Sequence, residues 1–97
     1  MIKVFIEQYC QPGKETQLRD LLMELRDMAM RQRGYISGET LRDIINPSHF
    51  KIISTWSNLR DWKTWQGSPQ RLLIEEMMES MTNNGRKLHI FTVDRES

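Results

Sequence analysis

The sequence contains a single cysteine, no long hydrophobic run and almost no net charge. Cys10 alone can neither close an intrachain disulfide nor supply a cysteine-type zinc site. The longest uninterrupted apolar runs are three residues long, as at 4–6, which excludes a bilayer-spanning helix. Fourteen Lys and Arg against thirteen Asp and Glu leave a net charge of +1. Composition therefore gives no electrostatic reason to expect nucleic acid or an anionic membrane as a partner.

What is present suits one small folded domain. Three Trp, three Phe, two Tyr and seven Met argue against disorder, and we expect residues 1–97 to form a single domain. Residues 1–6 run directly into the charge of Glu7, without the apolar stretch of a signal peptide. Together with the lone cysteine, this predicts a reduced, cytoplasmic setting.

Periodicity predicts a strand and then a helix in the first third of the chain. Alternating apolar residues over 1–10 are typical of a strand, which Pro12-Gly13 ends. From Lys14 to about Arg33 the apolar residues recur at helical spacing, and Gly34 is a suitable stop. This apolar stripe consists of Leu18, Leu21, Leu22, Leu25, Met28 and Ala29.

The rest of the chain predicts a hairpin, an interrupted helical segment and a final strand. Residues 35–43 indicate a polar strand near an edge, paired with 50–56 through a turn at Asn46-Pro47-Ser48. Asn58 is a helix N-cap, and Ser68-Pro69 starts a second helical segment after Gly67. We expect that segment to reach about Thr82, a turn at Asn83-Asn84-Gly85, and a last strand at Leu88–Asp94.

The resulting order is β-α-β-β-α-β. With right-handed crossovers it gives an α+β, ferredoxin-like fold, a four-stranded antiparallel sheet with the helices on one face. Strands one, three and four place apolar groups on both sides, which would leave a large apolar patch exposed. We therefore expect a homodimer in which two sheets pack face to face.

Several stretches match a familiar pattern: Gly34–Leu41, Asn46-Pro47, Ile53–Ser57, Asp61–Trp65 and Ser68-Pro69. Together they resemble the antibiotic biosynthesis monooxygenase (ABM) family of small dimeric α+β barrels. Pro12-Gly13-Lys14 also stands where that family turns from its first strand into its first helix, so the resemblance covers essentially the whole chain.

The resemblance implies a pocket between each sheet and its own helices. Characterised relatives oxidise aromatic polyketides or quinols without metal or flavin, or bind and degrade haem. The haem degraders use an Asn on the first strand, a Trp on the second helix, and a His ten residues after that Trp. Here Trp65 matches the Trp, Glu75 stands in place of the His, and the first strand has no Asn.

Five residues are candidate substrate contacts. The resemblance implies that Trp65 stacks on an aromatic substrate, with Trp62 beside it, although both also fit simple core packing. Met77 belongs to a Met-rich stripe that suits either an adaptable pocket wall or the core. Tyr9 and Glu39 lie at strand ends, where pocket mouths often occur.

Proton transfer by an imidazole would have to use His49 or His89, the only histidines, which are the candidate catalytic residues. Their separation shows no metal-ligand spacing, so no metal site is expected. The basic residues, Arg86 among them, are scattered among acids and indicate solvated surface.

Two classes of function remain open, and a third hypothesis is less favoured. The leading hypothesis is a cofactor-independent monooxygenase acting on a small aromatic, polyketide or quinol-type substrate with dioxygen. Such a reaction needs a substrate that forms a stabilised carbanion, and a protein that supplies a base and an oxyanion donor. The alternative is a non-catalytic dimeric module that binds a hydrophobic small molecule. The third is haem binding, with His89 as the axial ligand.

Overall fold

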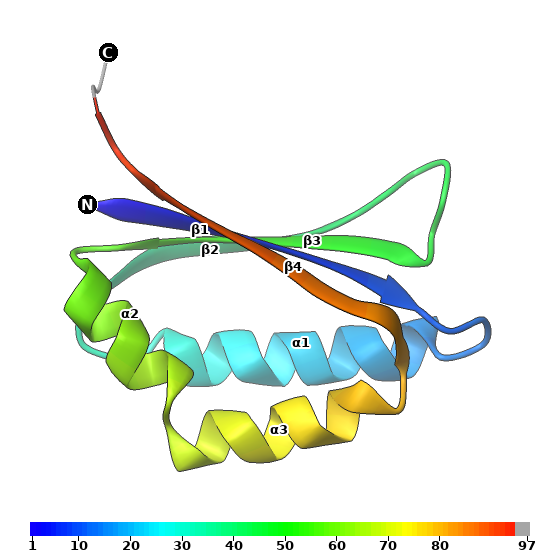
Figure 1. Cartoon of the computed structure of the whole chain (residues 1–97). Coiled ribbons are helices and arrows are strands. Elements are labelled where there is room, and N and C mark those ends of the chain that lie inside the picture. The colour runs from blue at the N-terminus through cyan, green and yellow to red at the C-terminus, as the bar shows by residue number, and fades with distance from the viewer. Residues whose placement is uncertain (95–97) are drawn as a thin grey trace.

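The computed structural model describes residues 1–94 and consists of one antiparallel sheet with three helices on one of its faces (Figure 1). The layout is the ferredoxin-like α+β fold that the sequence predicts. No helix in residues 1–94 has the length and apolar character that crossing a membrane requires. The elements are β1 (Ile2–Cys10), α1 (Glu15–Ala29), β2 (Tyr35–Arg42), β3 (His49–Trp56), α2 (Leu59–Gln66), α3 (Pro69–Glu79) and β4 (Thr82–Thr92).

The four strands are arranged in the order β2-β3-β1-β4, so the first strand lies inside the sheet and β2 is an edge, as its polar sequence predicts. Ile2 pairs with Trp56 of β3 and with Thr92 of β4. Because side chains alternate along each strand, this register places Ile2, Val4 and Trp56 on the helix-covered face.

Helix α1 buries the predicted stripe against the sheet, with Leu18 and Leu22 in its core. It ends at Ala29 rather than near Arg33. The N–H groups of Arg31 and Gln32 bond to carbonyls three residues back, which tightens the chain into turns before Gly34. The predicted end of this helix was therefore about one turn too late.

The second helical segment is interrupted where the sequence indicates. Asn58 accepts a hydrogen bond from the N–H of Asp61 at 2.8 Å, which caps α2. Ser68 accepts one from the N–H of Arg71 at 3.3 Å, with Pro69 in the first turn of α3. These two caps turn the chain so that α2 and α3 cover different parts of the sheet (Figure 1).

The boundary between α3 and β4 differs from the prediction. The helix ends at Glu79, and Asn83-Asn84-Gly85 lies inside β4 rather than in a turn. Gly85 has φ of 65°, and the pairing of β1 with β4 shifts register between Glu7 and Tyr9. The turn-forming residues lie in a β-bulge, so the strand continues through them. Glycine tolerates the positive φ that this bulge requires.

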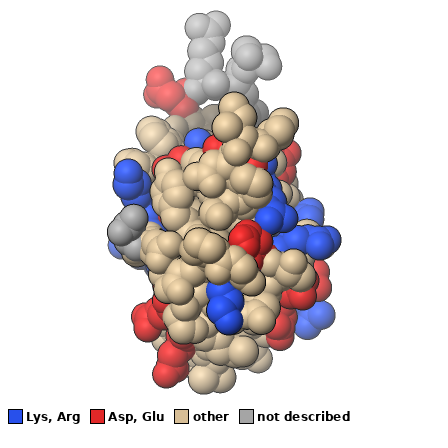
Figure 2. All heavy atoms as spheres, turned by 90° about the vertical axis from the view of Figure 1, so that its right-hand side faces the viewer, with Lys and Arg blue, Asp and Glu red and all other residues tan. Residues whose placement is uncertain are grey.

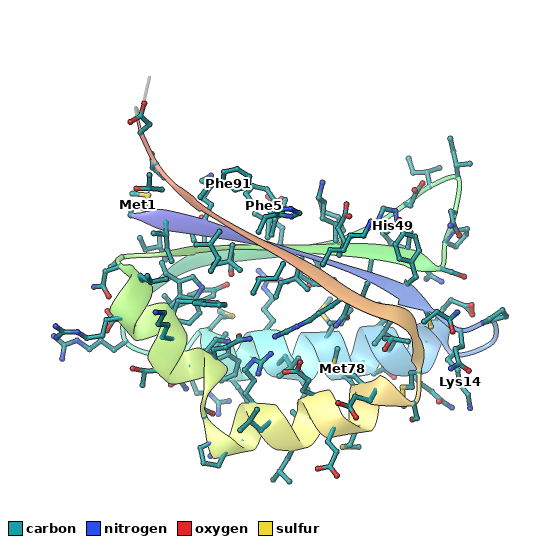
Figure 3. The ribbon with its side chains drawn as sticks, in the orientation of Figure 1. Met1, Phe5, Lys14, His49, Met78 and Phe91 are labelled. Carbon is teal, nitrogen blue, oxygen red and sulfur yellow. The ribbon has the colours of Figure 1, made fainter. Side chains whose placement is uncertain are left out.

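The core lies between the helices and the inner sheet face, in two adjoining clusters. One surrounds Phe50 and Leu18, and the other surrounds Trp56 and Val4; all four side chains are almost fully buried. Met78 projects from α3 toward the sheet (Figure 3) and joins the first cluster.

Among the described residues, no helix covers the outer sheet face. Phe5 and Phe91 lie there edge to face, with 5.4 Å between ring centres, and Phe91 is 54% exposed (Figure 3). The loop between β2 and β3 rises on the same side of the sheet (Figure 1), and its residues Ile44 and Ile45 are almost fully exposed. The prediction of apolar side chains on both faces is confirmed.

Charged side chains are mixed in sign at the end of the molecule where this loop lies. In Figure 2 acidic and basic groups are interspersed around a largely uncharged middle, without a broad patch of one sign.

Candidate functional site

A small, partly open cavity of about 90 Å³ lies between the helices and the inner face of the sheet. Strands β1, β2 and β3 form its floor, and the three helices form its walls. Such a position, concave and mostly apolar with a few polar groups, is typical of a ligand site.

All three tryptophans of the chain line this cavity. Trp62 and Trp65 are one turn apart on α2, so they point to the same side of that helix, and both are buried. Trp56 ends β3 and donates its indole N–H to Ser54 at 3.0 Å. Tyr35 packs edge to face on Trp56 with 5.4 Å between ring centres. The cavity is therefore aromatic on several sides.

A polar cluster lies in the same lining, formed by Gln8 of β1, Arg71 and Glu75 of α3, and Arg86 of β4. Arg71 is only 5% exposed, donates to the carbonyl oxygen of Gln66 at 2.9 Å, and forms an ion pair with Glu75 one turn later. The other carboxylate oxygen of Glu75 lies 3.4 Å from a guanidinium nitrogen of Arg86.

The electrostatics of this cluster follow from its burial. Burial lowers the pKa of the Arg71 guanidinium from its usual value, the carboxylate of Glu75 raises it, and the nearby cation of Arg86 lowers it. Arginine nevertheless stays protonated in proteins. The cavity therefore holds a permanent cation that solvent barely reaches.

The sequence profile described as "Antibiotic biosynthesis monooxygenase" matches residues 1–76. The chain belongs to the antibiotic biosynthesis monooxygenase family. This membership confirms the family resemblance and agrees with the ferredoxin-like layout. A comparison with curated protein sequences finds no match.

Solved structures of ABM-type proteins share the fold. One from Deinococcus radiodurans, provisionally named an antibiotic biosynthesis monooxygenase, superposes with a TM-score of 0.93 at 17% identity, covering 100% of this chain and 96% of that one. A Nitrosomonas europaea protein with the same provisional name gives 0.91 at 13% identity, covering 98% and 100%. SnoaB, a cofactor-independent oxygenase from Streptomyces nogalater, gives 0.84 at 14% identity, covering 98% and 95%. Identities this low show a shared fold and leave the substrate open.

The structure brings three of the candidate residues of this ABM family member to the cavity. Trp62 and Trp65 form its wall. Glu39 borders it from the edge strand β2, but Glu39 pairs with Ile53 and Ile53 with Phe5, so the Glu39 side chain lies on the outer sheet face. Met77 is 55% exposed on α3 and is absent from the lining, whereas its neighbour Met78 is buried there. Their roles in binding stay predictions.

The other candidates lie on the outer sheet face. Tyr9 and His49 stack there, with 4.5 Å between ring centres and planes 4° apart. His89 pairs across the sheet with Phe5, on the same side. A catalytic role for His49 or His89 stays a prediction, and within residues 1–94 the cavity itself contains no imidazole.

His49 has acidic neighbours of its own. Its Nδ1 lies 3.2 Å from Asp43, and its Nε2 lies 3.6 Å from Glu7, which also approaches Lys51 at 3.7 Å. The Asp43 carboxylate accepts the backbone N–H of Asn46, the His49 imidazole and the N–H of Ile45, and these bonds lower its pKa. This cluster organises the loop between β2 and β3.

Haem does not fit the residues that line the cavity. Glu75, at the position of the iron-ligating His of the haem degraders, contacts both Arg71 and Arg86. Across residues 1–94, no group of three or more His, Cys, Asp or Glu side chains could hold a metal ion. Among residues 1–94, the lining therefore offers haem iron no imidazole ligand.

Sequence reasoning missed the polar cluster. Arg86, read as solvated surface, is only 23% exposed in its side chain and lines the cavity. Nothing in the sequence distinguished Gln8 and Arg71 from surface residues. A lone glutamine on a strand, and an arginine four residues before a glutamate, are equally common on solvent-exposed surfaces. Their convergence depends on the pairing of β1 with β4 and on the packing of α3.

Proposed function

We propose that this protein is a cofactor-independent monooxygenase that acts on a small aromatic, polyketide or quinol-type molecule with dioxygen. One observation carries the proposal: an aromatic cavity that contains a buried cation, Arg71. Trp65 and Trp62 would hold the ring of the substrate, and the guanidinium would stabilise negative charge on its oxygen. Membership of the ABM family supports the same class of reaction.

The chemistry can be written for an anthrone-like substrate. Loss of a proton from its activated CH₂ group gives an enolate, which transfers one electron to dioxygen. The carbon radical and superoxide then combine to a peroxide anion, and return of the proton first removed gives the hydroperoxide. Loss of water then leaves a carbonyl. One oxygen atom enters the product and the other leaves as water, and the substrate carbon supplies all four electrons.

The side chains of the cavity can assist at two points. The guanidinium groups of Arg71 and Arg86 would stabilise the enolate oxygen, because they are already oriented and poorly solvated. Glu75 is the carboxylate in the lining that could accept the proton there. Catalysis by His49 or His89 would need a different arrangement from the one this single chain shows.

An oxygen electrode tests the proposal directly. The protein is mixed with anthrones and hydroquinones, and oxygen uptake is compared with that of buffer and of heat-denatured protein. We expect uptake above both controls, and one atom of ¹⁸O in the product when ¹⁸O₂ is used with an anthrone. No uptake above buffer, with the substrate recovered unchanged, would overturn the proposal.

We also propose that the working unit is a homodimer, formed through the outer sheet face. The support is the helix-free face with Phe5 and the exposed Phe91, a kind of apolar patch that a monomer rarely leaves in water. A second copy of the same face would cover it isologously. The reduced, buried thiol of Cys10 fits the cytoplasmic location that we retain as part of this proposal.

A second function is favoured by one feature of the cavity. Glu75 is engaged by two guanidinium groups and no imidazole is near, so the lining lacks a free base within residues 1–94. A non-catalytic binding module for a hydrophobic molecule would need none. A ligand that stabilises the fold yet is recovered intact after many hours in air would favour this second function.

A further inference from the structure

The polar cluster of the cavity contains more positive than negative charge. Two guanidinium groups, Arg71 and Arg86, face a single carboxylate, Glu75. Among residues 1–94, Glu75 and Arg86 are the charged groups that shift the pKa of Arg71. The cluster therefore keeps one net positive charge beside an apolar wall, where a charge without a partner is costly.

Gln8 gives a second, independent sign of an incomplete site. It is 6% exposed and lines the same cavity, yet its side-chain oxygen is buried without a hydrogen-bond partner among the described residues. Buried amide oxygens in folded proteins are nearly always paired, so one left unpaired beside a cavity points to a donor on a ligand. Because an amide can be turned about, Gln8 can offer either its oxygen or its NH₂ group.

We propose that this cavity selects an aromatic anion, whose anionic oxygen pairs with Arg71 and Arg86 and whose neighbouring hydroxyl donates to Gln8. The proposal rests on the proposed function, because it names the substrate class for the same cavity. Glu75 acts as a built-in counterion: its two oxygens bridge the guanidinium groups and hold them in place, and it offsets one of their two charges. A carboxylate and a phenolate share this chemistry, and the experiments below distinguish them.

The first experiment uses the unaltered protein and two ligands of the same shape. Isothermal titration calorimetry at neutral pH compares 2-naphthoate with the uncharged 2-naphthamide. We expect the carboxylate to bind on the order of tenfold more tightly, since hydrogen bonds to charged groups are the stronger ones. A 2-naphthol titration across its own ionisation shows whether a phenolate is accepted as well. Equal or weaker binding of the carboxylate, or no binding of either ligand, would overturn the proposal.

Two substitutions then move affinity in opposite directions. Arg86→Gln removes one positive charge and should weaken 2-naphthoate binding on the order of tenfold. Glu75→Gln removes the counterion and should tighten it. Neither should change 2-naphthamide binding by a comparable factor. Arg19→Gln, an exposed position on α1, is the matched charge control. If both cavity variants weaken both ligands alike, the cluster is only structural and the proposal fails.

Gln8→Leu separates the hydroxyl contact from the charge. The apolar side chain removes an unpaired buried oxygen, so the melting temperature should rise or hold. The same change should abolish the preference for 3-hydroxy-2-naphthoate over 2-naphthoate, and a preference that survives would remove Gln8 from the site. These binding results are independent of oxygen uptake, so anion selectivity can fail while turnover of neutral quinols stands, and the reverse.

Discussion

The side chain of Asp61 occupies the space in which a Cβ atom on Gly34 would lie. Gly34 has φ of 86°, and its carbonyl accepts the N–H of Ser57 at 2.7 Å. Asp61 in turn exchanges hydrogen bonds with Asn58, the cap of α2. This contact fixes the start of β2 against the start of the helix that carries Trp62 and Trp65.

Gly34→Ala is therefore expected to destabilise the protein for two reasons. The left-handed conformation costs about 1–2 kcal/mol for alanine, and displacement of Asp61 disturbs a cap worth about 1 kcal/mol. Gly13→Ala is the matched control, because Gly13 has φ of 85° with no atom near its missing Cβ. Chemical unfolding of both variants measures the difference, and equal losses would show that the Asp61 contact carries no energy.

Trp65→Phe should weaken the binding of an aromatic ligand by about 2–10-fold, because a smaller ring offers less stacking surface. The truncation should cost about 1–2 kcal/mol of stability, since Trp65 is 7% exposed within a packed cluster. Titration calorimetry and thermal unfolding give the two numbers. Lys63→Gln, exposed on the same helix, is the control. Unchanged affinity would assign Trp65 to packing alone.

The loop between β2 and β3 should lose stability in acid through Asp43. Its carboxyl pKa is lowered by bonds from Asn46, His49 and Ile45, so the charged form is favoured in the folded state. The sign is that of a depressed acid: the contribution is complete above the ordinary pKa of about 4 and is lost as the pH falls through the lower, folded value. Between pH 5 and pH 2 the melting temperature of the Asp43→Asn variant should therefore fall less than that of the unaltered protein. Parallel curves would contradict this role.

The thiol of Cys10 should react slowly with disulfide reagents in the folded protein. It is 2% exposed, and burial raises its pKa, with the charge of Glu15 adding to the effect. Its S–H donates to the carbonyl of Gln11 at 3.2 Å. Because the thiolate is the reactive form, a disulfide reagent such as DTNB at pH 8 should modify the native protein far more slowly than the protein in denaturant. Comparable rates would show that the thiol is accessible.

Phe91→Lys should shift the proposed dimer toward monomer. The substitution places a charge on the outer sheet face, where Phe91 packs on Phe5. Sedimentation at micromolar concentration should show a dimer for the unaltered protein and a lighter species for the variant. Leu73→Lys, 65% exposed on α3, is the control and should remain dimeric. A stable monomer of the unaltered protein would remove the dimer proposal.

Local signals predicted most of the fold. The strand predicted at 1–10, the capped helices after Asn58 and Ser68, and the polar edge strand predicted at 35–43 all depend on periodicity or caps that act over a few residues. The errors came where a local signal had two outcomes. The residues Asn83-Asn84-Gly85 are as compatible with a turn as with a bulge. They form a bulge here because β4 pairs with β1 on both sides of them.

By itself, then, the sequence determined the kinds of element, their order and the family, together with a tryptophan pair whose spacing puts both indoles on one side of a helix. Only the tertiary structure decided that Gln8, Arg71, Glu75 and Arg86 share one cavity, and that both histidines lie on the other face of the sheet. The physical reason is that the meaning of a charged or polar side chain depends on what surrounds it. Its partners come from distant segments, and whether water or a guanidinium stands beside it is set by packing rather than by its neighbours in the chain.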